Sequence, residues 1–471
     1  MPVHNAAFYA ALFFILGIAL GSFTAGLAGR YFLVAVFVLV TGVALYFLNK
    51  KHLAALAIFM LIGCGYYFAD DAGAKSAEII YNRDVSFEGV VRKSELTENG
   101  QDIFVGNIKL YAGRYPSYEY GDRLSLQGKI QEPQEEYKNY FLKDGILGTM
   151  RNPKIILVGI NAGNPIKASL LKIKSKAENT FKALLPYDEA LFLGGLVLGS
   201  KADYSREFRE TLSRSGTTHL VALSGYNISV IAKGVAFFFA LVFSRSATFF
   251  ISLIFIFLFV IMTGAEASVT RAGFMGAIAL LANQTGRVYS FKNAAVIAAL
   301  FMLLENPKIL VFDLGFQLSF AALLGIVYLE PVIGKVFRLK REPGFLAWRE
   351  NFKTTLAAQL AVFPILIMKF GVVSLSGIVS NILILGLIPW TMFFGFLMGI
   401  FGFISHYLSW LLGFIVAPIL SYELMIIEFF SKFGYFSEIN LSISFAIIYY
   451  VILFIVIAHV KRREVLEIGK I

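Results

Sequence analysis

Charged residues and cysteine are scarce in this sequence. Only 15% of its 471 residues are Asp, Glu, Lys or Arg, whereas an average globular domain carries about 25%. The single cysteine, Cys64, excludes an intramolecular disulfide. The five histidines lie too far apart to form an HxH or HExxH zinc motif. Composition therefore excludes a soluble enzyme, a disulfide scaffold and the commonest histidine metal sites, and we expect no metal, no cofactor and no catalytic residue.

Hydrophobic residues are abundant instead. They make up 58% of the chain, with 47 phenylalanines and 41 glycines, and the mean hydropathy is +0.71. Several apolar runs exceed the roughly 18 residues that mark a membrane-spanning helix. We therefore predict a polytopic α-helical membrane protein with about 10–12 transmembrane helices and one inserted β domain.

Residues 1–77 are predicted to form the N-terminal transmembrane helices, with apolar segments at 8–27, 31–48 and 53–69. No Lys or Arg precedes the first segment, and two more follow at once, so we expect a retained helix and not a cleaved signal peptide. The pair Lys50-Lys51 should lie in the cytoplasm. The chain then reaches the outer side of the membrane at about Asp70.

Residues 78–164 differ from the rest, with 11 basic against 12 acidic residues and apolar residues at every second position. Two runs show this alternation: Phe104, Gly106, Ile108 and Leu110, then Leu124, Leu126, Gly128 and Ile130. Asn99-Gly100 is a strong two-residue hairpin signal. We predict an extracytoplasmic β domain of about five strands, with the size and spacing of an OB-like barrel. An ordinary sandwich fits the pattern too.

Residues 165–215 are predicted to form an amphipathic helical connector that is too polar to span the membrane. Its apolar stripe consists of Leu170, Ile173, Ala177, Phe181 and Leu184. Such a helix either rests on the membrane surface or packs against the β domain.

The region 216–471 should contain the remaining spans. These are expected at 220–243, 248–264, 267–283, 294–304, 310–329, 356–368, 375–387, 390–404, 408–420 and 443–458. The basic loop 335–353 and Lys461-Arg462-Arg463 should be cytoplasmic. Both agree with an outer β domain only if one more pass or a re-entrant segment lies within 408–430. The excess of 18 basic over 11 acidic residues fits the positive-inside rule at least as well as a polyanion-binding surface, so charge alone does not show nucleic-acid binding.

The block 219–229, HLVALSGYNIS, is the most polar interruption of an apolar segment. Ser224-Gly225, with His219 and Asn227 on either side, would expose backbone polar groups at or inside the bilayer. Such a break is tolerated only where protein or a water-filled cavity meets it. The alternative is an ordinary helix entry at the interface, with His219 among the headgroups.

This block closely resembles the signature HLLAISGLH of the ComEC competence-protein family, and departs from it at Tyr226-Asn227, where the family usually has Leu-His. Three further elements resemble the family's motifs in the same order. They are Thr263-Gly264 with Ser268–Ala272, Asn306-Pro307 with Asp313–Phe320, and Pro364, Phe370-Gly371 and Asn381 closed by Pro389. The helices of 1–77, the β domain and Tyr140–Ile146 look like the family's amino-terminal region, so the resemblance covers essentially the whole chain.

The resemblance implies an inner-membrane channel for single-stranded DNA during natural transformation, with helices 220–460 enclosing the path. Many family members continue into a metallo-β-lactamase-like domain, but no HxHxDH motif occurs in this sequence. We therefore expect a channel without a nuclease of its own. GxxxxGK[ST] is also absent. The implied partners are single-stranded DNA, the lipid bilayer, a DNA receptor, a separate nuclease and a cytoplasmic ATP-driven motor or single-strand binder.

Polar residues inside predicted spans are candidates for the DNA path, because such groups usually face a cavity or a partner. The candidates are His219, Ser224, Gly225, Asn227, Arg271, Gln317, Ser319 and Asn381. Each has a structural alternative. Arg271 can pair with Glu266 or with helix carbonyls, Gln317 and Ser319 can join helices, and Asn381 can cap a broken helix. Lys233 and Lys369 are expected to extend to the membrane interface.

The β domain offers a second set of candidates, Arg92, Lys93, Lys109 and Tyr111. OB-folds bind single strands through a basic groove with stacking aromatic rings, and Tyr115, Tyr118 and Tyr120 would supply further rings. The slightly negative charge of the domain argues against a strong electrostatic footprint. A structural or docking role is the alternative.

Two other classes of function remain open. A secondary transporter for a small or lipid-linked solute also uses broken helices, but it needs a coupling acid near the middle of the membrane, and Glu266 and Asp313 both lie near span ends. A membrane scaffold whose outer domain recruits other proteins is the third possibility.

Overall fold

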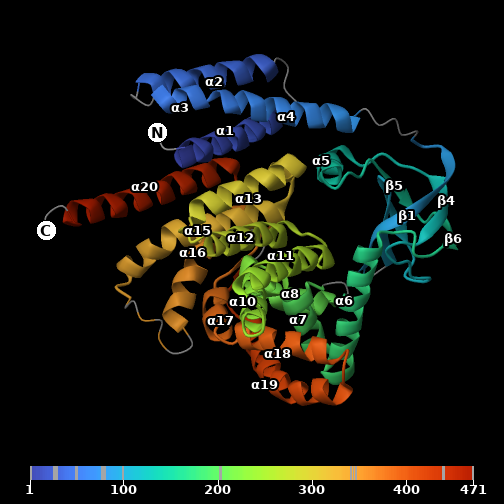
Figure 1. The fold of residues 1–471 in the computed structure, drawn as a ribbon. Coiled ribbons are helices and arrows are strands. Elements are labelled where there is room, and N and C mark those ends of the chain that lie inside the picture. Colours follow the sequence, from blue (N-terminus) through green and yellow to red (C-terminus); the bar gives the residue numbers. More distant parts are fainter. Residues whose placement is uncertain are drawn as a thin grey trace. The chain divides into compact units, whose positions relative to one another are not determined.

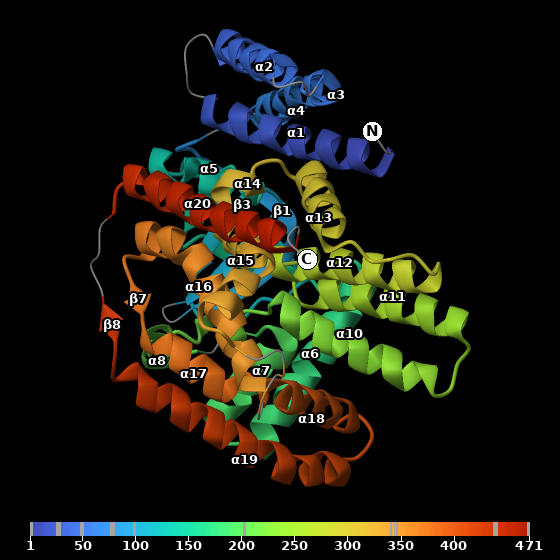
Figure 2. The same ribbon diagram turned by 90° about the vertical axis from the view of Figure 1, so that its left-hand side faces the viewer.

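The computed structural model describes residues 3–24, 30–47, 51–75, 81–97, 100–200, 204–339, 342, 344, 347–436 and 441–468. The chain divides into two compact units, Met1–Lys172 with Val235–Phe316, and Ile173–Gly234 with Gln317–Ile471. Figures 1 and 2 label most of their helices and strands. Three helices pass from one unit into the other: α6 (Pro165–Leu184), α10 (Gly225–Ala240) and α15 (Leu314–Val336).

The first unit contains the N-terminal helices, the β domain and a set of helices from the middle of the chain. Its helices are α1 (Val3–Thr24), α2 (Arg30–Phe47), α3 (Lys51–Leu56), α4 (Ile58–Lys75), α5 (Glu135–Lys143), α11 (Arg245–Met262), α12 (Ala267–Gln284), α13 (Phe291–Glu305) and α14 (Ile309–Phe312). Helices α1 and α4 approach closely at Gly17 and Gly63, where an added Cβ would lie 2.1 Å from a carbonyl oxygen of the other helix. Such small residues let helices pack closely in a membrane.

Among its described residues, the second unit is helical apart from one short pair of strands. Its elements are α7 (Tyr187–Leu198), α8 (Arg206–Arg214), α9 (Thr218–Val221), α16 (Trp348–Phe370), β7 (Val373–Ser374), α17 (Ser376–Ile384), α18 (Ile388–Phe401), α19 (His406–Ser431), β8 (Tyr435–Phe436) and α20 (Ile443–Ile468). Strand β7 pairs with β8, and both are visible in Figure 2.

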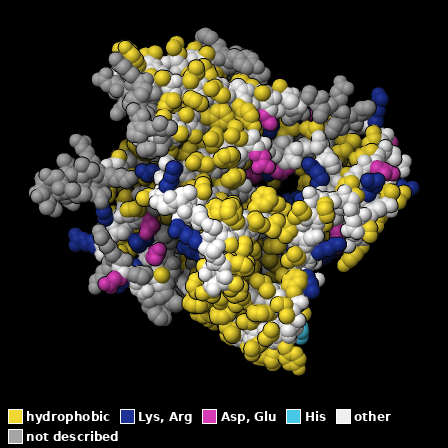
Figure 3. Space-filling model, viewed as in Figure 1, with side chains coloured by type: hydrophobic (Ala, Val, Ile, Leu, Met, Phe, Trp, Pro, Cys, Tyr) yellow, Lys and Arg dark blue, Asp and Glu magenta, His cyan; other side chains and the backbone are white. Residues whose placement is uncertain are grey.

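The prediction of a polytopic membrane protein is confirmed. Among the described residues, seven helices are long and apolar enough to cross a membrane, or eight if one bent pair counts as a span, and two shorter apolar helices occupy Val34–Phe47 and Asn227–Ala240. Large hydrophobic side chains remain exposed on them, such as Phe393, Trp410 and Phe414 of α18 and α19. Figure 3 shows hydrophobic side chains covering this part of the surface. Such a surface suits contact with lipid.

One prediction near the C-terminal end was wrong. The segments 375–387 and 390–404, expected as separate spans, are α17 and α18, a single pair bent by 55° at a short break. Pro389 in the first turn of α18 favours a new helix start there. The agreement of the charge assignments with an outer β domain depended on one more pass or a re-entrant segment within 408–430, but α19 runs without a break through this stretch. The bent pair is therefore the broken or re-entrant element of this region.

The described part of the β domain contains six strands where about five were expected. They are β1 (Asp84–Thr97), β2 (Gly100–Val105), β3 (Ile108–Ala112), β4 (Arg123–Lys129), β5 (Gly148–Arg151) and β6 (Lys154–Gly159), in the order β5-β3-β2-β1-β4-β6. The long β1 pairs with β4 through its first half and with β2 through its second half. Strand β5 runs parallel to β3, and Thr149 of β5 also bridges to Gln131, just after β4. The strands β1 to β5 thus curl into the small barrel that an OB-like domain requires.

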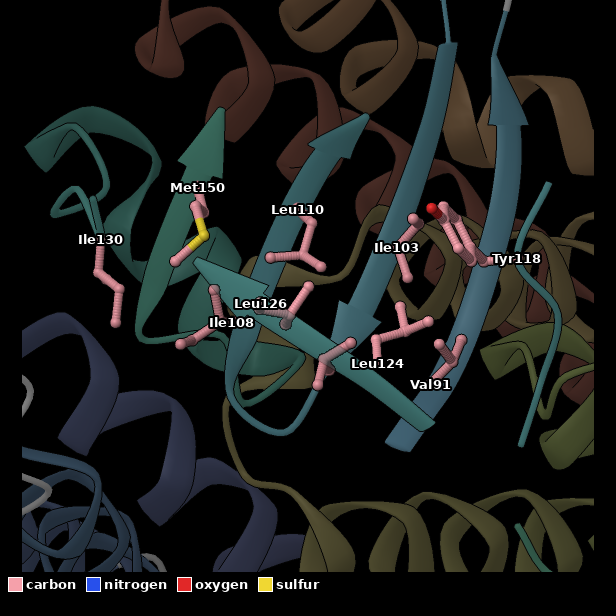
Figure 4. Packing of buried hydrophobic residues seen from close by; sticks show 10 residues of the cluster. Val91, Ile103, Ile108, Leu110, Tyr118, Leu124, Leu126, Ile130 and Met150 are labelled. Carbon is pink, nitrogen blue, oxygen red and sulfur yellow. The ribbon is translucent and has the colours of Figure 1, made fainter. Parts of the chain in front are cut away.

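The core of the β domain lies inside this barrel. Figure 4 shows buried side chains from β1 to β5 pointing toward one another. They include Val91, Ile103, Leu110, Leu126 and Met150. The expected face through Phe104, Gly106, Ile108 and Leu110 was wrong, because the chain turns at 106–107 between β2 and β3. Ile103 and Val105 are therefore buried with Ile108 and Leu110, and Phe104 faces outward.

The connector helix α6 packs against protein at both ends. In the first unit, the Lys167 ammonium lies 4.6 Å from the centre of the Tyr120 ring in the β domain. In the second unit, Ala177 and Phe181 of the predicted stripe are buried, and Phe181 lies against Gly399 of α18. Packing against the β domain, one of the two alternatives, therefore occurs at the start of this helix. Asn99 and Lys50 lie outside the described residues, as do the side chains of 461–463.

Candidate functional site

The block 219–229 forms an interrupted helix in the second unit. Helix α9 ends at Val221, and α10 begins at Gly225. The Ser224 hydroxyl accepts a hydrogen bond from the Asn227 backbone N–H at 3.4 Å, in the manner of a helix N-cap. His219 is exposed on α9. The break therefore has a local cause, a capping serine followed by glycine.

Asn227 holds this break against a neighbouring helix. Its side chain is 2% exposed, and Nδ2 donates to the carbonyl oxygens of Leu196 in α7 at 3.2 Å and of Leu220 in α9 at 3.3 Å. Its Oδ1 accepts from the Ser224 hydroxyl at 2.9 Å. The amide thus satisfies two buried carbonyl groups, one in the last turn of α7 and one in α9, which lie near helix ends. This residue stabilises the break from inside the protein.

The other path candidates lie in both units. Arg271 of α12 belongs to the first unit and is 7% exposed. Ser319 of α15 and Asn381 of α17 belong to the second unit, with 8% and 0% exposure. Gln317, also in the second unit, is half-buried. A cavity shared by all of these residues remains a proposal. Lys233 and Lys369 are exposed, in agreement with side chains that extend to an interface.

Two family-like motifs meet in the first unit. Asn306, before α14, donates from Nδ2 to the carbonyl oxygen of Lys143 at 2.6 Å. The Lys143 ammonium lies 3.2 Å from Asp313 Oδ2 and 3.0 Å from Asp144 Oδ1. Burial lowers the pKa of Lys143, but the two carboxylates outweigh it, so the pKa lies above its ordinary value. Figure 2 shows α5, which ends at Lys143, beside α14.

A second ion pair ties the same loop to the N-terminal helices. The Lys308 ammonium, 2% exposed, lies 2.5 Å from Asp70 Oδ2 and 3.8 Å from Asp71 Oδ1 at the end of α4. Asp313 in addition accepts the backbone N–H of Phe316 at 2.7 Å and so caps α15. We call these six residues, Asp70, Asp71, Lys143, Asn306, Lys308 and Asp313, the junction. It connects the β domain, α4 and the start of α15.

The β domain carries a row of cationic and aromatic side chains on the outer face of β1, β2, β3 and β5. Lys93, Phe104 and Lys109 are cross-strand neighbours, as are Tyr111 and Arg151. The Lys109 ammonium lies 4.7 Å from the Tyr111 ring centre and 5.6 Å from that of Phe104.

Two acids lie on the same face as these side chains. Lys109 also pairs with Asp102 at 2.8 Å, and Lys93 pairs with Glu95 at 2.6 Å. Burial lowers the pKa of Lys109, but Asp102 and Tyr111 outweigh it and the pKa is raised. The face therefore combines rings and cations with two acids.

The remaining β-domain candidates are placed differently from one another. Arg92 is exposed at the bulge of β1, and its carbonyl accepts from Lys167. Tyr118 is 8% exposed and belongs to the core, so it cannot supply a stacking surface. Tyr115 is 83% exposed, and Tyr120 lies under Lys167. Among the described residues no group of three or more His, Cys, Asp or Glu side chains could hold a metal ion.

A family model described as "Competence: Competence protein" matches residues 196–463, more than half of the chain. The chain belongs to the competence protein family. The matched region begins at the end of α7 and includes the interrupted helix, α12, the Asn306–Phe320 motif and the bent pair α17–α18. The resemblance that the sequence motifs indicated is thereby confirmed.

A curated relative agrees with this assignment. ComE operon protein 3 of Bacillus subtilis (strain 168) is 26% identical over 275 residues, which cover 56% of this chain and 34% of that protein. The chain thus matches about a third of the length of this relative. No solved structure matches.

Several contacts of the junction were not foreseen from the sequence. The pairs Lys143–Asp313 and Lys308–Asp70 join residues far apart in the chain. The only signal was the occurrence of each residue inside or beside a family-like motif. Two buried acids, Glu189 of α7 and Glu423 of α19, were also missed. A glutamate within a long apolar run was the available signal for Glu423.

Proposed function

We propose that this chain takes up single-stranded DNA through the cell (inner) membrane during competence. The observation that carries the proposal is the family match over residues 196–463, which contain the broken helices α9–α10 and α17–α18. Non-helical backbone at membrane depth is tolerated where it lines a cavity or is buried in protein. A path for a polyanion needs such openings, because a continuous apolar helix presents no polar group to a phosphate.

The junction supports an extracytoplasmic β domain. Lys143 of the β domain, the end of α4 and the start of α15 are in contact, so these three points lie on one side of the membrane. In the sequence, Lys50-Lys51 comes before α4, whereas Asp70 and Asp71 come near its end. If α4 crosses the membrane, the two lysines lie on the side opposite to the β domain, and their positive charge favours the cytoplasm for that side. The DNA receptor and a separate nuclease would then act on the side of the β domain, and a motor or single-strand binder on the other side.

Gene deletion is the first test of this proposal. A strain without the gene should bind labelled DNA at its surface and carry none into the cytoplasm, and the complete chain should restore entry. Normal entry in the deletion strain would exclude the proposed function. A secondary transporter or a scaffold would then be the better explanation.

Arg271 tests the path within the membrane. Arg271→Ala should lower DNA entry while surface binding and protein abundance stay unchanged, because a buried cation at this position would meet the phosphates. Arg271→Lys should restore part of the entry if a point charge suffices, and little if the forked guanidinium is needed. A fall in abundance parallel to the fall in entry would instead show that Arg271 is a structural partner.

The outer face of the β domain tests contact with single strands. Tyr111→Ala should weaken binding of an oligonucleotide to the purified full chain, by the about 1–3 kcal/mol that one stacked base contributes. Arg151→Ala should also reduce the slope of the logarithm of the binding constant against the logarithm of the salt concentration by about 1, the effect of losing one phosphate contact. Lys154→Ala, at an exposed residue of β6, is the control. If all variants bind the oligonucleotide as tightly as the wild type, this face does not contact single strands, and the alternative structural or docking role is favoured.

A further inference from the structure

Two carboxyl groups are buried within the helices of the second unit. Glu423, in α19, has no exposed surface, and Glu189, in α7, is 8% exposed. Helix α19 is one of the candidate spans, and it packs against α7, α8, α17 and α18. Acids inside membrane helices are rare and mark ion or proton pathways more often than structural positions.

Each carboxyl group is bonded through one oxygen only. Glu423 Oε1 accepts a hydrogen bond from the Thr391 hydroxyl of α18 at 2.7 Å, and Glu189 Oε1 accepts from the Ser421 hydroxyl of α19 at 2.5 Å. The second oxygen of each acid is buried and has no hydrogen-bond partner among the described residues. Both groups therefore retain a free position for a proton.

No cation within the part of the chain that the structure describes compensates these two acids. Helices α17 and α18 contain no titratable residue, and on α7 Tyr187 and Asp188 are exposed. Helix α8 carries Arg206, Glu207, Arg209, Glu210 and Arg214, all exposed, with Arg206 and Arg214 paired to Glu210. The other neighbours that titrate are Tyr204, His219, His406, Tyr407, Tyr422, Glu428 and Lys432, together with Lys174, Lys176, Glu178 and Lys182 of α6. Holding a carboxylate buried without a cation is very costly, so the neutral acid is favoured.

A third buried polar group lies in the same bundle. Asn381 of α17 has no exposed surface, and neither its Oδ1 nor its Nδ2 has a hydrogen-bond partner among the described residues. Helix α17 packs against α19 and forms the bent pair with α18. Three packed elements thus each bury a polar group with unused hydrogen-bonding capacity, next to a break in the membrane helices. Native cores seldom retain such groups without a role.

We propose that Glu423 is a proton-binding group, with Glu189 as a second station, through which the chain couples proton movement to DNA transfer. The coupling rests on the proposed function, whereas the proton binding does not. In each cycle one proton from one side of the membrane adds to the carboxylate to form the neutral acid, and the same proton leaves to the other side. No other reactant is consumed.

Proton binding can be measured without DNA. Infrared difference spectra of the purified full chain in lipid nanodiscs, recorded as a function of pH, should show the carbonyl band of a protonated carboxyl near neutral pH. Glu423→Gln should remove the Glu423 contribution to this band and leave that of Glu189, whereas Glu428→Gln, at an exposed acid on the same helix, should leave the band unchanged. A spectrum of Glu423→Gln identical to that of the wild type would overturn the proposal.

Coupling is measured by DNA entry in complemented deletion strains. Glu423→Gln keeps an acceptor for Thr391 and should fold normally, yet it should lose DNA entry, whereas Glu428→Gln should retain it. Wild-type entry with Glu423→Gln would overturn the coupling, as would entry that depends on sodium and not on the proton gradient. If the wild-type chain itself restores no entry, the proposed function fails while the infrared result still decides the proton site.

Discussion

At the scale of single residues, the polar groups of the membrane part serve different purposes. Asn227 uses both ends of its amide inside the protein. Among the described residues, Asn381 uses neither end, and Glu423 uses one of its two oxygens. A buried polar group that is fully bonded stabilises a local structure, and one that is not is available for a ligand or a proton. This difference separates a supporting residue from a transport candidate.

Asn227 gives the first prediction at this scale. Asn227→Ala should lower the stability of the purified protein by about 1–3 kcal/mol, because the carbonyl groups of Leu196 and Leu220 lose their buried donor. Asn227→Asp should cost more, since it removes the donor and adds a buried charge. Thermal unfolding in detergent measures both. Asn179→Ala, at an exposed residue of α6, is the control, and equal melting temperatures for all variants would contradict the assigned role.

At the scale of elements, the junction determines how the β domain is attached to the helices of the first unit. The contacts come from α4, from α5 of the β domain and from the loop before α15. Lys308 and Lys143 are almost fully buried there, with side-chain exposures of 2% and 10%. Burial makes such pairs sensitive to the loss of one partner, because the other charge is left uncompensated.

Asp313 contributes to the junction both an ion pair with Lys143 and the N-cap of α15, and two substitutions can separate these contributions. Asp313→Asn keeps an N-cap for α15 and removes the ion pair with Lys143, whereas Asp313→Ala removes both. The alanine variant should therefore be less stable than the asparagine variant by about 1 kcal/mol, the usual contribution of a helix N-cap. In a double-mutant cycle, Asp313→Asn and Lys143→Met together should lower the free energy of unfolding by less than the sum of their separate effects. Additive effects in this cycle would show that the ion pair contributes nothing to attachment.

At the scale of the whole molecule, the bent pair α17–α18 decides the topology of the C-terminal half. Four crossings separate the basic loop 335–353 from residues 461–463 if the pair is one broken span, and three if it is re-entrant. Both basic segments are expected in the cytoplasm, which requires an even number of crossings. The charge argument and the structure agree when α17–α18 counts as one span.

Cysteine labelling tests this topology. Cys64 is buried, and Cys64→Ala provides a background into which Arg114→Cys, Glu342→Cys or a cysteine after Ile471 is introduced. An impermeant maleimide should label Arg114→Cys in intact cells, and the other two only after permeabilisation. Labelling of Glu342→Cys from outside would contradict the charge argument. Labelling of the C-terminal cysteine alone from outside would show a re-entrant α17–α18.

The sequence by itself determined the class of this protein and most of its elements. Hydropathy and the spacing of apolar residues are properties of neighbouring positions in the chain. The apolar helices, the alternating strands and the break at Ser224-Gly225 therefore follow from local patterns. The family could be recognised for the same reason, because its motifs are short and local. The errors occurred where local signals compete. Phe104 faces outward because a turn shifts the alternation, and the segments 375–387 and 390–404 form one bent pair.

Only the tertiary structure decided which residues act together. Asn306 meets Lys143 across 163 positions and Lys308 meets Asp70 across 238, separations that no local pattern encodes. The fold likewise bonds Asn227 internally and buries Glu189 and Glu423 with no cation beside them among the residues described. Burial and partners belong to packing and not to composition, because the cost of a charge depends on everything that surrounds it.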